Sequence, residues 1–189
     1  YVRAYATNSA GTAYGNEVSF TTTGGGGLAI GDTYQGGIIA YFYQPGDLGY
    51  VAGETHGIIA APTDQSTGAQ WGCYNTNIGG TQSGIGYGAA NTTAIVNGCA
   101  EAGIAARICD DLVLNGYSDW YLPSINELEQ LSVNLHANGI GSFIDGYGYW
   151  SSTEYGANYA WGFTFYNGNA DYYLDSKSFT TYVRAVRAF

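Results

Sequence analysis

The sequence predicts a mixed α+β fold of short antiparallel strands, two helices and long irregular loops. Three observations support this prediction: apolar or alternating runs near both ends, two stretches with helical spacing between them, and 30 glycines spread along the chain. With 46% apolar residues among 189, the chain can bury the core of one domain of about 150 residues and carry a smaller appendage.

The charge balance argues against several classes of partner. Fifteen acidic and five basic residues give a formal net charge of −10, and no basic stripe is present to neutralise phosphates or sulfates. We therefore expect no nucleic-acid partner and no sulfated polysaccharide. No apolar stretch reaches the length of a membrane span, so direct membrane insertion is not expected. Because the chain contains no Met, we expect a mature or excised piece.

The first 22 residues alternate apolar and polar side chains on both sides of a turn at 8–11, which predicts a two-stranded hairpin. With its YVRAY opening, NSAG turn and FTT ending, this piece resembles the last two strands of a fibronectin type III or other immunoglobulin-like domain. A glycine-rich linker is expected at 23–31, and residues 32–189 are expected to form the main domain.

Two apolar runs open the main domain. Residues 36–43 predict a buried strand closed by a turn at 44–47, and residues 57–61 predict a second strand. The stretch 66–90 is rich in Gly, Asn and Thr, and we expect it to be irregular. So long an irregular segment usually has a ligand-binding or structural role.

Two helices are predicted after this stretch. Asn91 or Thr92 is expected to cap the first, which weakens near its glycines and resumes over 104–113. The second begins at a capping box, Ser124 with Glu127 three residues later, and continues with three leucines at helical spacing. These apolar faces are expected to lie in the core.

The three cysteines form an odd set. Cys73 and Cys99 both follow Gly in loop-like contexts, so we prefer a disulfide between them, with Cys109 as a buried thiol inside a helical pattern. Three reduced cysteines remain the alternative. No cysteine spacing suggests zinc, and His56 and His136 are the only histidines that could join such a site.

Aromatic residues are concentrated at the end of the chain, where residues 143–189 hold 8 of the 19 tyrosines. In the predicted strand 160–166, Trp161, Phe163 and Phe165 share one face, so residues 162, 164 and 166 share the other. A closing strand is predicted at 182–189, where apolar and polar residues again alternate.

Five ordered blocks carry a resemblance to a known family: SDWYLPS at 118–124, EL at 127–128, YWSSTE at 149–154, AW at 160–161 and VRAVRAF at 183–189. Over about residues 30–189 the chain resembles a bacterial family related to the C-terminal domain of collagen-like adhesins. It is still more similar to the variable proteins of diversity-generating retroelements, whose C-terminal segment is rewritten through adenine-directed mutagenesis. The resemblance implies a C-type lectin-like fold and a receptor-binding role on a bacterial surface or phage virion.

The resemblance also implies a variable segment at about 150–182. Its variable, ligand-binding positions would be Gly156, Asn158, Tyr159, Gly162, Thr164, Tyr166, Asp171, Tyr172, Tyr173, Leu174, Asp175, Ser178, Phe179 and Thr181. All are types that adenine mutagenesis of AAY codons can produce. Tyrosine supplies a rigid contact area and a hydroxyl, while small polar residues adapt around it. We expect a protein or glycan receptor, although packing remains an alternative role for each tyrosine.

An enzyme is the less favoured alternative. His56 with Asp64 and Ser66, or Cys109 with His136, are the conceivable catalytic sets, and neither has a recognisable sequence context. The related formylglycine-generating fold shows that lectin-like scaffolds can host catalysis, but fold analogy alone is weak. We expect neither catalytic residues nor a cofactor.

A calcium-dependent lectin is the second alternative. Carboxylates could supply oxygen ligands, with Asp110, Asp111, Asp119 and Asp145 as candidates. The Glu-Pro-Asn and Gln-Pro-Asp signatures of calcium lectins are missing. Asp119 is better interpreted as an ordering residue beside Trp120, and Arg184 and Arg187 are expected to form structural ion pairs.

Overall fold

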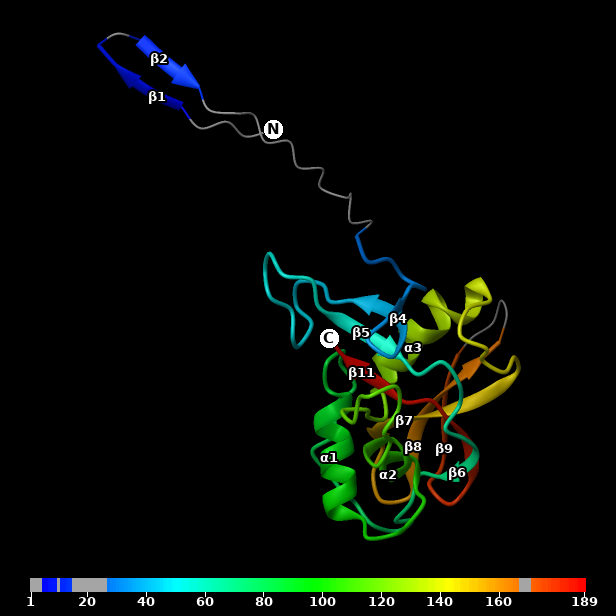
Figure 1. Ribbon diagram of the computed structural model, residues 1–189. Helices are drawn as coiled ribbons and strands as arrows, with labels where there is room; N and C mark the ends of the chain where they lie inside the picture. Colours follow the sequence, from blue (N-terminus) through cyan, green and yellow to red (C-terminus); the bar gives the residue numbers. More distant parts are fainter. Residues whose placement is uncertain (1–4, 10, 15–26, 167–170) are drawn as a thin grey trace.

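The computed structural model describes residues 5–9, 11–14, 27–166 and 171–189. At the N-terminus, β1 (Tyr5–Asn8) and β2 (Gly11–Tyr14) form an antiparallel hairpin with Asn8 opposite Gly11, so the turn lies where the sequence predicted it (Figure 1). Residues 1–4, 10 and 15–22 of the expected hairpin lie outside the described residues. Its assignment to an immunoglobulin-like domain remains a prediction.

A four-stranded antiparallel sheet joins the two ends of the main domain. It contains β3 (Thr33–Tyr34), β4 (Gly37–Phe42), β5 (Gly57–Ala60) and β11 (Val186–Ala188), in the order β11-β5-β4-β3. Strands β4 and β5 are the two predicted apolar runs. Just before β3, the Gly31 N–H donates to Ile39 O at 2.8 Å and so joins this segment to β4.

A five-stranded sheet carries the aromatic C-terminal segment. It contains β6 (Ser66–Gln70), β7 (Tyr147–Glu154), β8 (Tyr159–Phe165), β9 (Asp171–Ser176) and β10 (Thr180–Val183), in the order β6-β10-β7-β8-β9. Only the β10–β7 pair is parallel among the described strands. Strand β9 therefore lies at one edge of the sheet.

Two strand predictions need correction. Strand β6 lies inside the stretch expected to be irregular, and because only Ala69 in it is buried, no apolar periodicity reveals it. The predicted closing strand 182–189 is divided into β10 and β11. The division falls at Arg184 and Ala185, where the Arg184 side chain turns inward to Asp64 and Ala185 O accepts the Ala61 N–H.

The helices are α1 (Gly88–Gly98), α2 (Ala105–Asp110) and α3 (Ile125–Asn134), followed by a 3₁₀ turn at His136–Asn138. The capping box of α3 is confirmed: the Ser124 side chain accepts the Glu127 N–H, and the Glu127 carboxylate accepts the Ser124 N–H at 2.7 Å. Glu127 also accepts the Gly86 N–H, and its burial raises its pKa to about 7. This carboxylate thus joins α3 to the loop before α1.

The predicted start of the first helix and the predicted end of its continuation are both wrong. Helix α1 begins three residues before Asn91, whose amide instead donates to Gln82 O and to Ser152 Oγ. The Thr92 hydroxyl donates to Gly88 O inside the helix. Helix α2 ends at Asp110, and the following residues up to Leu114 leave the helix.

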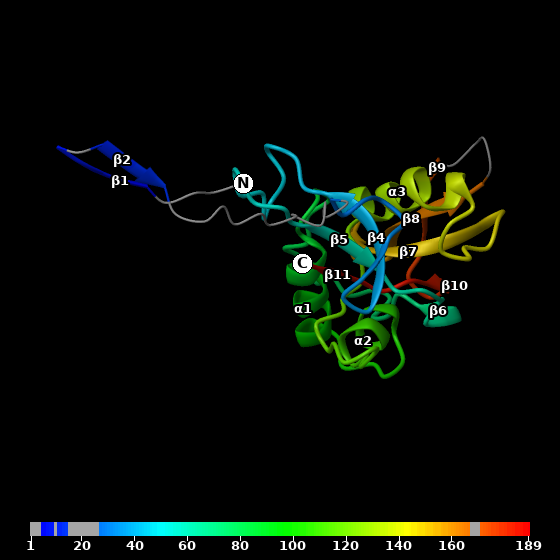
Figure 2. The same ribbon diagram turned by 45° about the horizontal axis from the view of Figure 1, so that its top comes forward.

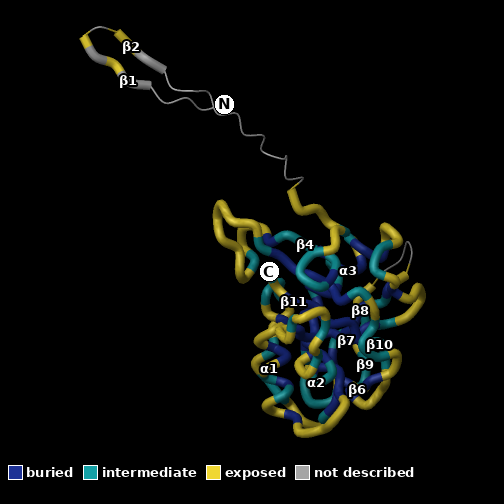
Figure 3. Tube along the Cα trace, viewed as in Figure 1, coloured by how far each residue is buried: buried dark blue, intermediate teal, exposed yellow. Residues whose placement is uncertain are grey.

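Helix α3 lies on one side of the five-stranded sheet, and α1 and α2 lie on the other (Figures 1 and 2). Helix α3 packs its leucines against Tyr149, Phe163 and Phe165. On the other side, α1 and α2 pack against a cluster that contains Trp71 and Trp150. Figure 3 shows the buried residues gathered along the central strands, with the loop tips exposed.

Candidate ligand-binding surface

The predicted variable positions do not lie on a single face of the sheet. In the β8–β9 register, Gly162 is opposite Tyr173 and Phe163 is opposite Tyr172. Because side chains alternate along a strand, Tyr172 shares the α3 side with Phe163, whereas Tyr173 shares the other side with Gly162. A binding surface built from these residues would therefore extend around the β8–β9 edge of the sheet and would not be a single tyrosine-rich face.

Most of the fourteen positions reach solvent. Those that are exposed are Tyr159, Tyr166, Asp171, Tyr172, Leu174, Ser178 and Phe179. Those that are partly exposed are Gly156, Asn158, Thr164, Tyr173, Asp175 and Thr181, and Gly162 alone is buried. Tyr159, Tyr166 and Tyr172 have relative exposures of 48%, 51% and 41%, so about half of each side chain is available for contact.

A shallow depression of about 220 Å³ lies on the side of the sheet away from α3. It is lined by Gly146, Gly148, Thr164, Tyr173, Asp175, Thr180 and Thr181. Four of these residues belong to the predicted variable set, although they come from three different strands. The fold therefore brings together part of that set at one concave place.

The Tyr173 ring forms the floor of this depression. A Cβ atom on Gly162 would lie 2.2 Å from Tyr173 Cζ, and one on Gly148 would lie 2.5 Å from the Tyr173 hydroxyl oxygen. The ring also stacks at a tilt on Trp150, with centroids 6.2 Å apart, and its hydroxyl donates to Tyr149 O at 3.4 Å. Burial raises the Tyr173 pKa well above its usual value. Tyr173 is thus largely a packing residue.

Replacing Gly162 by Ala is expected to lower the free energy of unfolding by about 1–3 kcal/mol, because the new methyl group overlaps the Tyr173 ring. Urea denaturation measures the loss. Gly68→Ala is the matched control, since a Cβ there would meet its nearest neighbour, Thr180, at 3.9 Å. A Tyr173→Ala background should remove most of the Gly162→Ala penalty, and equal losses in both backgrounds would contradict the packing described.

Tyr172 is held on the other side of the sheet. Its ring meets Phe163 edge to face, with centroids 5.0 Å apart. Burial and a hydrogen bond to Glu129 on α3 raise the pKa of Tyr172 to about 12. Tyr172 therefore presents an oriented, protonated phenol at the sheet edge rather than a freely rotating one.

A buried ion pair anchors the turn that links β9 to β10, and sequence reasoning missed it. Lys177 Nζ donates to Glu154 Oε1 at 2.5 Å and to Thr76 O at 2.8 Å, and lies 4.4 Å from the Trp71 ring centroid. The two charged side chains are 0% and 3% exposed. The sequence contained one signal for this residue. Lys177 is the only lysine of the chain, and because mutagenesis of AAY codons cannot produce lysine, it would be a fixed residue within the variable segment.

The two arginines near the C-terminus form ion pairs, as predicted. Arg184, fully buried, contacts Asp64 at 2.7 Å and donates to Ala61 O and Gly141 O. Arg187 makes a two-pronged contact with Asp119, both distances being 2.7 Å, and this bonding lowers the Asp119 pKa. Asp119 therefore has the ordering role that the sequence suggested.

The residues considered for catalysis have other partners. His56 is hydrogen-bonded to Glu54 and to Phe189 O, and Asp64 is paired with Arg184. His136 contacts Asp145 at 3.2 Å. Cys109 is fully buried, and this burial raises its thiol pKa far above the usual value, which disfavours the reactive thiolate.

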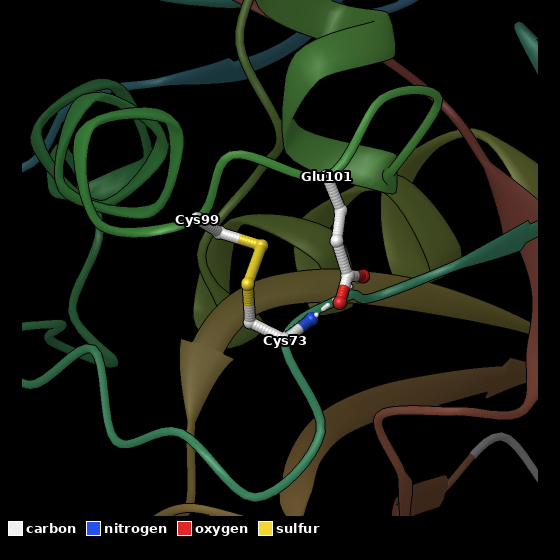
Figure 4. A group of neighbouring side chains, drawn as sticks. All are labelled: Cys73, Cys99 and Glu101. Carbon is white, nitrogen blue, oxygen red and sulfur yellow. Dashed lines mark hydrogen bonds between the residues drawn. A yellow bond between two sulfur atoms is a disulfide. The ribbon is translucent and has the colours of Figure 1, made fainter.

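One cluster of potential metal ligands occurs within the described ranges, formed by Cys73, Cys99 and Glu101 (Figure 4). Its two sulfurs form a disulfide, with the Cα atoms 5.8 Å apart, as the sequence suggested. The Glu101 carboxylate accepts the Cys73 N–H at 2.9 Å. The cluster is therefore a covalent link between the loop after β6 and the end of α1.

The mixed α+β architecture, with mostly strands and few helices, is consistent with a C-type lectin-like domain. A family model described as the Lcl C-terminal domain matches residues 61–187. The chain therefore belongs to this family, the C-type lectin-like domain family of retroelement variable proteins, which is a family of binding domains. A search of curated proteins finds no match. Within the described residues, no helix has the length and apolar character needed to cross a membrane.

Proposed function

We propose that this chain is a receptor-binding variable protein, diversified by a retroelement and displayed on a bacterial surface or phage virion. It binds a protein or glycan through the tyrosine-rich region around the β8–β9 edge. The observation that carries this proposal is the position of Tyr159, Tyr166 and Tyr172, which are about half exposed at the two ends of β8 and on the edge strand β9.

The contrast between contact residues and scaffold supports the proposal. Segment 150–182 contains the exposed positions, yet it is held by Trp150, Phe163 and Lys177, each at most 3% exposed. Neither Trp nor Lys arises from AAY codons, so adenine mutagenesis at such codons would change contact residues without producing the two anchors Trp150 and Lys177. Rigid aromatic contacts on a fixed scaffold are the arrangement that antibody paratopes use.

The charges support an uncharged or cationic partner. The four described basic residues, Arg107, Lys177, Arg184 and Arg187, all donate hydrogen bonds within the domain. With a net charge of −10, little remains to attract nucleic acid or sulfated glycans. The disulfide suits an extracellular location, and the N-terminal hairpin would belong to an immunoglobulin-like stalk.

Replacing Tyr159, Tyr166 and Tyr172 together by Ala is expected to weaken receptor binding at least about 30-fold, since one tyrosine hot spot typically contributes about 2 kcal/mol or more. The unfolding free energy should fall by about 1–3 kcal/mol in total, because about half of each side chain is exposed and only Tyr172 is held by a ring contact with Phe163. Binding of the labelled domain to a glycan array and to an array of cell-surface proteins measures the loss.

The matched control replaces Tyr50, Tyr74 and Tyr87, which are exposed tyrosines outside the variable segment. Receptor binding should survive this control. If both triple variants bind equally well, the β8–β9 edge is not the binding surface.

The neighbouring DNA tests the diversification itself. A near-identical template copy of the segment encoding about residues 150–182, differing at adenines and lying beside a reverse transcriptase gene, is expected. Its absence would leave a carbohydrate-binding adhesin domain without diversification as the better interpretation.

A further inference from the structure

We propose that the depression contains a slot for a hydroxylated planar ring, that Tyr173 fills this slot in the present chain, and that the residue at position 173 thereby determines what the site can bind. With Tyr173 in place, a ligand meets a shallow surface. With a small residue there, a phenol or similar ring of the ligand would enter the slot. That position 173 varies in nature rests on the proposed function; the slot itself does not.

The walls of the slot come from three neighbouring strands. Trp150, Gly162 and Tyr173 are aligned across β7, β8 and β9, since Trp150 pairs with Gly162 and Gly162 with Tyr173. The missing side chains of Gly148 and Gly162 leave the space that the ring occupies, because a Cβ on either would lie 2.5 Å or less from a Tyr173 atom. Trp150 supplies an aromatic surface at the inner end.

The slot has a polar end that suits a hydroxyl group. The Tyr173 hydroxyl donates to Tyr149 O at 3.4 Å and is also hydrogen-bonded to Thr181. Both a carbonyl acceptor and a threonine hydroxyl therefore face the position where the ring substituent lies. A ring that carries a hydroxyl is expected to bind better than the same ring without one, because an unfilled polar end is costly to desolvate.

The slot communicates with solvent. Tyr173 is partly exposed and lines the depression together with Thr164, Asp175 and Thr181, so a ring that replaced it could enter from outside. These neighbours offer hydroxyl and carboxylate groups at the rim. Engineered apolar cavities in protein interiors can bind small aromatic molecules such as benzene, and a slot that opens to solvent gives the ring a direct path of entry.

The test uses p-cresol, which reproduces the tyrosine side chain, and toluene, which lacks the hydroxyl. Tyr173→Ala is expected to bind p-cresol at least about tenfold more tightly than the unaltered protein, as measured by chemical-shift titration of the Trp150 indole N–H. Toluene should bind this variant about two- to tenfold more weakly than p-cresol. Tyr173→Thr, which favours a strand, serves as a second variant if Tyr173→Ala does not fold.

Two matched controls localise the binding. Tyr172→Ala removes the neighbouring ring on the opposite side of the sheet. There Phe163, and not a glycine, lies across from the ring, so this variant should gain no affinity for p-cresol. Adding Gly162→Ala to Tyr173→Ala should abolish the gain, since the methyl group fills the slot. The proposal is overturned if p-cresol binds Tyr173→Ala no better than the unaltered protein, or if Gly162→Ala leaves the gain intact. Neither result depends on whether the tyrosine triple variant still binds its receptor.

Discussion

Replacing Lys177 by Met is expected to lower the free energy of unfolding by about 3–5 kcal/mol, the usual effect of removing one partner of a buried ion pair. Glu154 would remain almost fully buried without its counter-charge. Its carboxylate oxygens also accept the Ile78 and Gly79 N–H groups, at 2.8 and 2.7 Å, so it cannot simply turn outward. The cation–π contact with Trp71 would be lost as well.

Urea denaturation of a double-mutant cycle measures this effect. Glu154→Gln in the Lys177→Met background removes the unpaired charge while keeping an acceptor for one N–H group, so much of the loss should be recovered. Simple additivity of the two single changes, or a loss below about 1 kcal/mol for Lys177→Met, would contradict a buried charge pair.

The ion pair also matters for the proposed binding surface. Lys177 lies in the turn between β9 and β10, and its backbone N–H donates to Asn158 O at 2.9 Å while its carbonyl accepts the Gly72 N–H at 3.2 Å. Its side chain reaches Thr76 in the irregular loop after β6. Because the loop and the β9–β10 turn share this anchor, substitutions at neighbouring surface positions can change contacts without releasing the turn.

Features with local causes could be predicted from the sequence. Helix α3 begins where its capping box places it, because Ser124 and Glu127 bond to each other's backbone within one turn. Strands β4 and β5 follow from continuous apolar runs, and they form the interior of the smaller sheet. In these segments nearby residues suffice to specify the conformation.

Features that depend on distant partners could not be predicted. Strand β6 is defined by its pairing with β10, more than a hundred residues away. Asn91 does not cap a helix because its side-chain amide donates hydrogen bonds to Gln82 and Ser152 instead. The packing role of Tyr173 requires two glycines on neighbouring strands. The alternation of side chains along a strand predicts which residues share a face of the sheet. It does not predict which of the two faces is covered by a helix.

Removing the disulfide by replacing Cys73 and Cys99 with Ser is expected to lower the free energy of unfolding by about 3–4 kcal/mol. The bond joins residues 26 apart, and closing a loop of this length restricts the unfolded chain by about that amount in the chain-entropy description. Cys109→Ala, which removes the buried free thiol, is the control and should cost less, about 1 kcal/mol. Equal stability of the double serine variant and this control would argue against a structural role.

The disulfide and the ion pair hold the same segment, so their losses should not be independent. The disulfide closes the chain from 73 to 99, and Lys177 and Glu154 bind residues 76, 78 and 79 inside that loop. Once the disulfide is absent, the loop can open locally, and Glu154 can reach water when Lys177 is replaced. We therefore expect Lys177→Met to cost less in the double serine variant than in the unaltered protein. An identical cost in both backgrounds would show that the ion pair is held by the sheet alone.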